Sequence, residues 1–277
     1  GSMVQSIIVE NDGEYRTVEG FGQKRDYTAL SKQEIRDIVK EAGIVGLGGA
    51  GFPTNVKLAP KNEEEIDYVI VNGAECEPYL TSDYRVMLEQ PEKVVGGLKV
   101  ILQLFDKAKG VIGIEENKPE AIRILSELVK DEPRIQVCTL KTKYPQGGER
   151  FLIYAVTGGR EINSTMLPAD AGCIVDNIAT VIAIYDAVCK TTPLIERVFT
   201  VTGDAIADPR NFRIKIGTNT QELIEAAGGF KQDPEKVISG GPMMGMAMFT
   251  LDVPVAKTSS AIPCLTKDQV AEMEPTA

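Results

Sequence analysis

The chain has 277 residues, of which 43% are hydrophobic and 25% charged, and its formal net charge is −10. This composition is typical of globular proteins, and the length suggests about two domains. The acidic balance argues against nucleic acid as a partner, because nucleic acid selects basic faces. No stretch reaches the roughly 20 apolar residues of a membrane-spanning helix. We therefore expect a soluble, cytoplasmic chain with no direct membrane insertion.

The cysteines and histidines limit the chemistry that the chain can perform by itself. Five cysteines are dispersed without a C-x-x-C pair, and histidine is absent. We expect reduced, partly buried thiols and no metal site in this chain. Because the commonest general base is missing, we assign no catalytic side chain and expect a bound cofactor to supply the chemistry.

The first 30 residues are expected to be a tag remnant and a linker. Residues 1–3 match the remnant of an expression tag, and residues 7–9 look like a single strand without a partner. The run 31–34 is a capping box, which predicts a helix that ends at Gly43.

A glycine-rich loop at residues 46–54 follows this helix and is the most informative segment. Four glycines lie within six positions, and Lys57 follows shortly after. Such a loop can present successive N–H groups to a phosphate, with the lysine adding a charge. Its spacing matches neither the dinucleotide fingerprint nor the Walker loop, so another phosphate-bearing cofactor is expected. The alternative is a tight connection without a ligand.

Buried strands then alternate with helices. Apolar runs at 67–72, 111–114 and 135–138 predict strands, and helices are predicted at 91–107, 119–130, 151–156 and 177–188. This alternation predicts a parallel, three-layer α/β domain with ligand-binding loops at the carboxyl ends of its strands. After Pro193, short alternating runs and one helix at 220–227 predict a small β-rich domain, followed by a polar strand or linker from about residue 257.

Three further segments carry polar groups at the places where ligands are expected. The strand ending at Asn72 leads into a turn with Glu75 and Glu77. The two carboxylates can accept hydrogen bonds from ligand hydroxyls. The alternative is that this segment is only a solvated acidic turn. The run 144–150 has a glycine pair before a helix and can offer N–H donors. The run 175–180 contains Asn177, which can also be an ordinary helix cap.

Taken in this order, the four segments resemble the flavin- and NADH-binding subunit of respiratory complex I, and more closely the C subunit of the Rnf complex, a ferredoxin:NAD⁺ oxidoreductase. The run 72–81 carries the closest similarity, and residues 196–249 resemble the soluble-ligand-binding β-grasp (SLBB) domain of both families. The resemblance implies a Rossmann-like flavin domain at 31–195, an SLBB domain at 196–256 and a linker at 257–277 to an iron–sulfur domain. It also implies a core fragment, without the barrel-like domain and the two [4Fe–4S] clusters of longer relatives.

The resemblance implies FMN as the cofactor and NAD(H) as the substrate. Residues implied for the phosphate and ribityl region are Gly48, Gly49, Gly51, Lys57, Asn177 and Thr180. Those implied for the rest of the flavin pocket are Asn72, Glu75, Tyr144, Gly147 and Gly148. Those implied for the nicotinamide nucleotide are Phe52, Glu77 and Glu149. The sequence departs from complex I at Leu58, near which a second aromatic is expected, and at Ala74 and Gly148, where acids are expected.

The implied activity is hydride exchange between NAD(H) and FMN, with electrons passing to clusters outside this chain. The implied partners are other subunits of an electron transport complex at the inner face of the cell membrane. Three alternatives stay open: a related carrier for a soluble amino-acid reductase, a cobalamin reductase, and a docking scaffold with a vestigial flavin site.

Overall fold

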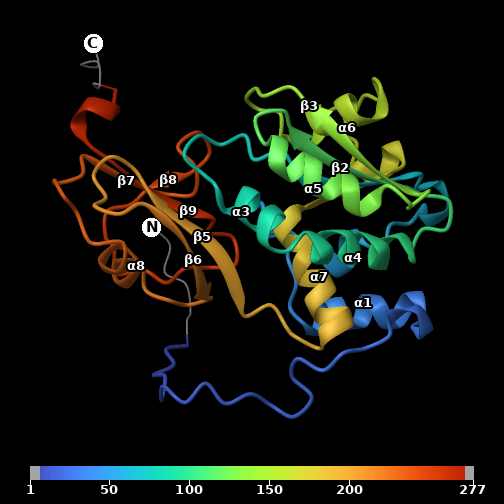
Figure 1. Cartoon of the computed structure of the whole chain (residues 1–277), viewed down its shortest axis with the longest axis horizontal. Coiled ribbons are helices and arrows are strands. Elements are labelled where there is room, and N and C mark those ends of the chain that lie inside the picture. Colours follow the sequence, from blue (N-terminus) through green and yellow to red (C-terminus); the bar gives the residue numbers. More distant parts are fainter. Residues whose placement is uncertain (1–6, 272–277) are drawn as a thin grey trace.

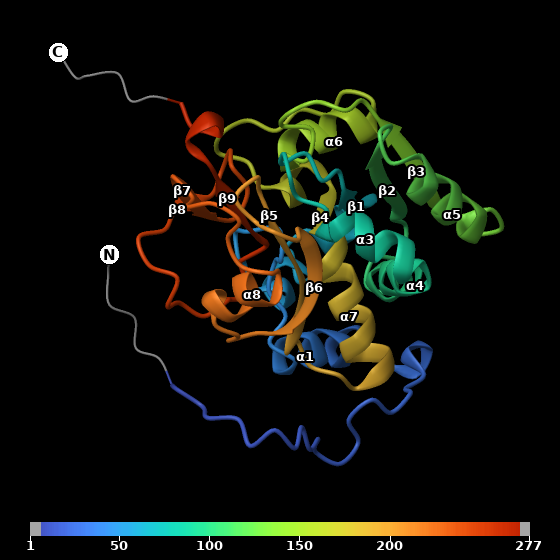
Figure 2. The ribbon, with the colours of Figure 1, turned by 60° about the vertical axis from the view of Figure 1, so that its left-hand side comes forward.

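The computed structural model describes residues 7–271 and contains two domains that lie side by side (Figure 1). The expected tag remnant at residues 1–3 lies outside the described residues. The domains meet where helix α3 (Ser82–Glu89) approaches strand β5 (Glu196–Thr202), as Figures 1 and 2 show from two sides. Within residues 7–271, no helix has the length and apolar character needed to cross a membrane.

The first domain is built on a parallel sheet with the strand order β3-β2-β1-β4. Its strands are β1 (Tyr68–Gly73), β2 (Lys109–Glu115), β3 (Ile135–Leu140) and β4 (Cys173–Asn177). All three pairings are parallel, so the four carboxyl ends lie along one edge. Asn72 at the end of β1 is in register with Asn177 at the end of β4. The predicted parallel α/β domain is confirmed.

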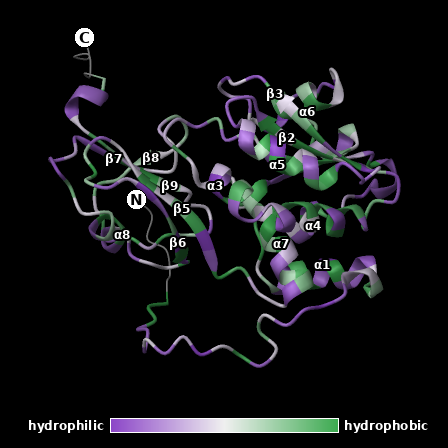
Figure 3. Cartoon of the chain, in the orientation of Figure 1, coloured by the Kyte–Doolittle hydropathy of each residue, from purple (hydrophilic) through white to green (hydrophobic). Residues whose placement is uncertain are grey.

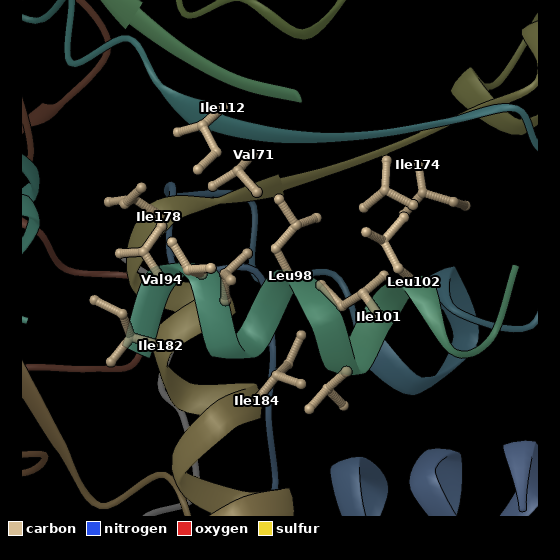
Figure 4. Packing of buried hydrophobic residues seen from close by; sticks show 14 of the residues in the cluster. Val71, Val94, Leu98, Ile101, Leu102, Ile112, Ile174, Ile178, Ile182 and Ile184 are labelled. Carbon is tan, nitrogen blue, oxygen red and sulfur yellow. The ribbon is translucent and has the colours of Figure 1, made fainter. Parts of the chain in front are cut away.

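Helices cover both faces of this sheet. The larger core contains residues of α3 and of α1 (Lys32–Glu41), α4 (Pro91–Leu102), α5 (Pro119–Val129) and α7 (Ile178–Lys190), while the smaller core contains residues of α6 (Glu149–Thr157). Alternation along β1 explains the two cores: Val69 and Val71 join the larger cluster, and Ile70 joins the smaller. Figure 4 shows side chains of α4 and α7 packed against Val71 and Ile112. In Figure 3, hydrophobic and hydrophilic stretches alternate along these helices, as expected for helices with one buried face.

Local signals in the sequence explain where the helices begin. Ser31 and Glu34 form the predicted capping box of α1, and Pro91 and Pro119 occupy the first turns of α4 and α5. Asn177 caps α7 by accepting a hydrogen bond from the N–H of Ala179 at 2.9 Å. The short helix α2 (Thr54–Lys57) follows the glycine loop directly.

The second domain is a five-stranded mixed sheet in the order β6-β5-β9-β7-β8. Besides β5, its elements are β6 (Arg210–Lys215), α8 (Thr220–Ala226), β7 (Lys236–Ser239), β8 (Met246–Ala247) and β9 (Ala261–Leu265). A separate core, which includes Phe199, Leu223 and Ile262, lies between the sheet and α8. The predicted second domain is confirmed as a small β-rich unit.

Several elements differ from the predictions. Of the strand or linker expected from about residue 257, the structure has a strand: β9 pairs with both β5 and β7 and so belongs to the second sheet, whereas the resemblance implied only a linker there. Residues 7–9 are extended and exposed and form no strand, because no strand among residues 7–271 lies beside them. Helix α3 and strand β4 were not predicted.

Candidate functional site

The glycine loop connects α1 to α2 and has an unusual backbone. Its ends are joined by hydrogen bonds from the Gly46 N–H to the Phe52 carbonyl (2.9 Å) and from the Gly51 N–H to the Gly46 carbonyl (3.2 Å). Gly49 has φ +111°, and a side chain there would enter open space. Within the described part of the chain, nothing accepts a hydrogen bond from the successive N–H groups of residues 48–50. The loop therefore offers a row of free donors.

The start of α7 lies against this loop. A Cβ atom on Gly48 would lie 3.4 Å from the Cβ of Asn177. The hydroxyl of the buried Thr180 accepts a hydrogen bond from the Leu47 N–H at 2.9 Å. The predicted residues Gly48, Asn177 and Thr180 are thus brought together at a helix N-terminus, where the backbone favours anions.

Lys57 lies beside the carboxyl end of β4. Its ammonium group donates to the Val175 carbonyl at 2.6 Å and pairs with Asp176 at 3.1 Å. Burial raises the pKa of Asp176, and the charge of Lys57 opposes that shift. Burial also raises the pKa of Glu149, again opposed by Lys57. Lys57 and Glu149, predicted from different segments, are therefore electrostatic neighbours.

The end of β1 is tied to the start of α6. The Asn72 side chain donates to the Gly147 carbonyl at 2.8 Å and accepts from the Ala74 N–H at 3.1 Å. The Gly147 N–H donates to the Cys76 sulfur at 3.3 Å. A side chain on Gly147 would collide with the Ala74 carbonyl, so glycine is required there by close approach. Gly148 is the N-cap residue of α6.

Glu75 supports helix α3. Its carboxylate accepts hydrogen bonds from the N–H groups of Asp83 (2.9 Å) and Tyr84 (3.0 Å), at the helix N-terminus. Burial, with a contribution from the nearby charge of Asp83, raises the pKa of Glu75 to about 7. In this arrangement both oxygens of Glu75 are engaged by the helix, so its predicted place against the flavin stays a prediction.

The residues predicted for the nucleotide lie around the mouth of the site. Glu77 accepts a hydrogen bond from the Met243 N–H of the second domain at 3.0 Å, and its other oxygen, Oε1, is buried without a partner among the described residues. Phe52 and Tyr144 are 49% and 39% exposed, so both rings are accessible. Glu75, Glu77 and Tyr144 also line a cavity of about 370 Å³ at the carboxyl ends of β1–β3.

Buried polar atoms without partners test whether these residues fit FMN. Within the described residues, no hydrogen bond reaches the Thr54 hydroxyl or the Gln146 Oε1, and the Asp176 carboxylate has only its ion pair with Lys57. Such atoms are rare in folded proteins unless a ligand or water satisfies them. Together with the free donors of the loop, they fit a ligand that has a phosphate at one end and hydroxyls and ring heteroatoms along its length. This combination of free N–H donors and oxygen acceptors therefore fits FMN.

Two residues of this region were missed by the sequence analysis. Asp83 accepts a hydrogen bond from the Asn177 side chain at 2.7 Å, and Arg197 of β5 donates to the Leu47 carbonyl at 3.5 Å. Arg197 is only 7% exposed. Neither belongs to a glycine-rich motif, and Arg197 lies in the second domain, so no local pattern could have indicated it. The available signal was its place in β5 at alternate positions with the apolar residues Phe199 and Val201, both of which are buried.

Comparison with protein families assigns both domains. The Nuo51 FMN-binding domain matches residues 39–186, which is more than half of the chain, and the SLBB domain matches residues 198–247. The chain resembles the fold of an NAD⁺-reducing [NiFe]-hydrogenase in the air-oxidized state, with a TM-score of 0.71 over 86% of this chain and 47% of that chain at 19% identity.

Curated relatives agree with these domains. The chain is 50% identical over 266 residues to the C subunit of the proton-translocating ferredoxin:NAD(+) oxidoreductase complex of Clostridium ljungdahlii, covering 96% of this chain and 58% of that protein. It is 47% identical to the C subunit of the Na(+)-translocating ferredoxin:NAD(+) oxidoreductase complex of Acetobacterium woodii, covering 97% of this chain and 60% of that protein. The chain thus spans less than two thirds of these relatives. In this chain an SLBB domain follows the flavin domain, and the chain, which is similar to the C subunits of these oxidoreductase complexes, belongs to the Nuo51 FMN-binding domain family.

Proposed function

We propose that this chain binds FMN at the glycine loop and exchanges a hydride between NAD(H) and FMN, the electrons then passing to [4Fe–4S] clusters outside these residues. The observation that carries the proposal is the row of free N–H groups at residues 48–50 beside the start of α7. A helix N-terminus and a loop of this kind both favour a phosphate. The family match supports FMN as the molecule that carries it.

The role of the chain's own residues is to bind and orient the flavin and the nicotinamide nucleotide. Under this proposal the loop and the start of α7 hold the phosphate, while Asn72, the 147–148 backbone and Tyr144 enclose the remainder of the flavin. Phe52 stacks on the nicotinamide nucleotide, and Glu77 and Glu149 accept hydrogen bonds from its hydroxyls. When bound, FMN supplies a ring that takes up a hydride and returns electrons singly. No acid or base from the chain is required, which agrees with the absence of histidine.

The names of the relatives support a proposal about the partners of this chain. Both proteins cited above are subunits of ion-translocating ferredoxin:NAD(+) oxidoreductase complexes. We therefore infer that this chain works as part of such a multi-subunit complex, held at the inner face of the membrane through other subunits. The experiments below separate this enzyme from a scaffold with a vestigial flavin site.

The phosphate assignment is tested by comparing FMN with riboflavin, which lacks the phosphate. Lys57→Ala would also leave Asp176 without its ion pair, so the comparison is made in an Asp176→Asn background. There, loss of the Lys57 ammonium is expected to weaken FMN binding about 10- to 150-fold, about 1.5–3 kcal/mol, with little change for riboflavin. Flavin fluorescence titration measures both affinities. An equal loss for the two ligands would show that Lys57 does not contact the phosphate.

The nucleotide assignment is tested by anaerobic stopped-flow bleaching of bound flavin by NADH. Phe52→Ala and Glu77→Gln are expected to slow reduction, while FMN affinity stays within about threefold, about 0.7 kcal/mol. Unchanged reduction in both variants would place the nucleotide elsewhere. Absence of flavin binding in the unmodified chain would favour the scaffold.

A further inference from the structure

The second domain contacts the glycine loop and the end of α1 through Arg197, Lys257 and Thr258. The guanidinium of Arg197 in β5 donates to the Leu47 carbonyl at 3.5 Å and to the Lys257 carbonyl. The Lys257 ammonium in turn donates to the Gly43 carbonyl, at the end of α1. At the other end of the loop, a Cβ atom on Gly51 would lie 2.7 Å from the Thr258 methyl group. The second domain thus contacts the loop at both ends.

Arg197 is also an electrostatic neighbour of the polar groups at the start of α7. Its charge acts on Asp83, which accepts a hydrogen bond from Asn177 at 2.7 Å. Asn177 caps α7, and Thr180 one turn later accepts from the Leu47 N–H. Leu47 is therefore held through its N–H by the first domain and through its carbonyl by the second.

A buried cation in this position has an electrostatic effect. Arg197 is 7% exposed, and burial lowers its pKa to about 10, opposed by the charge of Asp83. At that pKa the guanidinium remains charged at neutral pH. Charges that are withdrawn from water are screened weakly, so they act strongly on a ligand nearby.

Resting on the proposed function, we propose that Arg197 is a positioning residue that braces the glycine loop from the second domain and supplies positive charge near the phosphate end of the flavin site. The site's preference for a phosphorylated flavin is then a property of both domains. Under this proposal Lys57 acts from the carboxyl end of β4 and Arg197 from strand β5 of the second domain.

The chain offers a matched control for the charge. Arg213 lies on the neighbouring strand β6, in register with Val198, and its side chain is exposed. Both arginines line the same cavity between α7 and β5. Arg213→Met and Arg197→Met therefore remove the same charge from neighbouring positions, but only Arg197 contacts the loop. Arg197→Lys keeps the charge.

The first measurement is the ratio of riboflavin to FMN dissociation constants. Arg197→Met is expected to lower this ratio about tenfold. Arg197→Lys is expected to keep most of the ratio of the parent, and Arg213→Met is expected to leave the ratio unchanged. Asp83→Asn removes the carboxylate and keeps an acceptor for Asn177, so the ratio is expected to be retained or raised. An unchanged ratio in Arg197→Met overturns the proposal. Equal weakening of both flavins also overturns it, because that result indicates a general structural role.

The second measurement needs no flavin. Amide hydrogen exchange of residues 47–51 in the ligand-free chain is expected to be faster in Arg197→Met than in Arg213→Met, with β2 amides unchanged in both. Unchanged exchange in the loop would show that Arg197 does not brace it. If the unmodified chain binds neither flavin, the proposed function fails, and the exchange experiment still decides whether Arg197 holds the loop.

Discussion

The ion pair between Lys57 and Asp176 is expected to affect both the stability of the chain and its binding of FMN. Asp176 is 1% exposed at the end of β4, and the Lys57 ammonium lies 3.1 Å from it. Removing one partner of a buried pair leaves the other charge without compensation, which costs more than the pair contributes.

We predict that Lys57→Ala lowers the free energy of unfolding by about 3 kcal/mol, because Asp176 loses its counter-charge. Adding Asp176→Asn is expected to recover most of the loss. Urea denaturation of the two single variants, the double variant and the parent gives the coupling energy. Independent, additive effects would show that the two side chains do not depend on each other.

Glu75 makes stability depend on pH. Its pKa of about 7 in the folded chain lies above the ordinary value of 4.5. Between these values the folded chain binds more protons than the unfolded chain, so the free energy of unfolding falls as pH rises through this range. Above about pH 7 the contribution of Glu75 is constant.

We predict that, between pH 4.5 and 7.5, the parent loses up to about 3 kcal/mol more stability than Glu75→Gln, which cannot titrate. Chemical denaturation at several pH values measures the difference. The absolute stability of the variant is not the criterion, because glutamine can accept only one of the two hydrogen bonds. Parallel pH profiles would contradict a raised pKa at Glu75.

At the scale of elements, flavin binding by the glycine loop is expected to depend on the loop's backbone conformation as well as on its free N–H groups. Gly49 and Gly217 both have strongly positive φ, +111° and +101°, and at both positions the space that a Cβ atom would occupy has no atom within 4 Å. Gly217 lies between β6 and α8, on the second domain. The two positions therefore match in strain and differ in location.

We predict that Gly49→Val abolishes flavin binding with the fold retained, while Gly217→Val costs similar stability and leaves binding unchanged. Both changes force a β-branched residue into a conformation it resists, at about 1–2 kcal/mol. Flavin titration and thermal unfolding measure the two effects. Normal binding by Gly49→Val would favour the alternative in which the loop is only a tight connection.

Elements with local signals were predictable, and those defined by tertiary contacts were not. The capping box of α1 and the prolines of α4 and α5 lie in the sequence itself. Helix α3 has no side-chain cap of its own; Glu75, from the preceding loop, accepts bonds from its N-terminus. Strand β4 runs into α7 without a loop, and the predicted helix at 177–188 begins at its last residue, Asn177.

The residues of the candidate site also divide into those with a local sequence signal and those defined by tertiary contacts. The glycine loop, the end of β1 and the start of α7 could be recognised because each carries polar or glycine residues at the end of a predicted element. Arg197 and Asp83 could not, because their roles arise from contacts between segments distant in sequence. The sequence left a strand or a linker open after residue 257, and Pro263 argues against a central strand there. This proline is tolerated because it lies where the pairing of β9 with β5 ends.

At the scale of the whole molecule, Glu77 couples the two domains. Its carboxylate accepts from the Met243 N–H, and a Cβ atom on Gly241 would collide with it. A methyl group at residue 241 is therefore expected to displace the Glu77 side chain and break its hydrogen bond to Met243.

We predict that Gly241→Ala lowers stability by about 1 kcal/mol, the value of one hydrogen bond, and slows NADH reduction of the flavin to the same extent as Glu77→Gln. Urea denaturation and stopped-flow bleaching check the two parts. Full reduction rates in Gly241→Ala with slow rates in Glu77→Gln would show that Glu77 acts without its contact to the second domain.

The position of β9 has a consequence for biosynthesis. The second sheet places its last strand between β5 and β7, so the sheet cannot close until residues 261–265 have left the ribosome. The parallel sheet of the first domain is complete about 85 residues earlier, at Asn177. During that interval β5 lacks its central neighbour, and the glycine loop lacks the contacts of Arg197 and Lys257. The nascent first domain is therefore expected to acquire its core well before it acquires a finished flavin site.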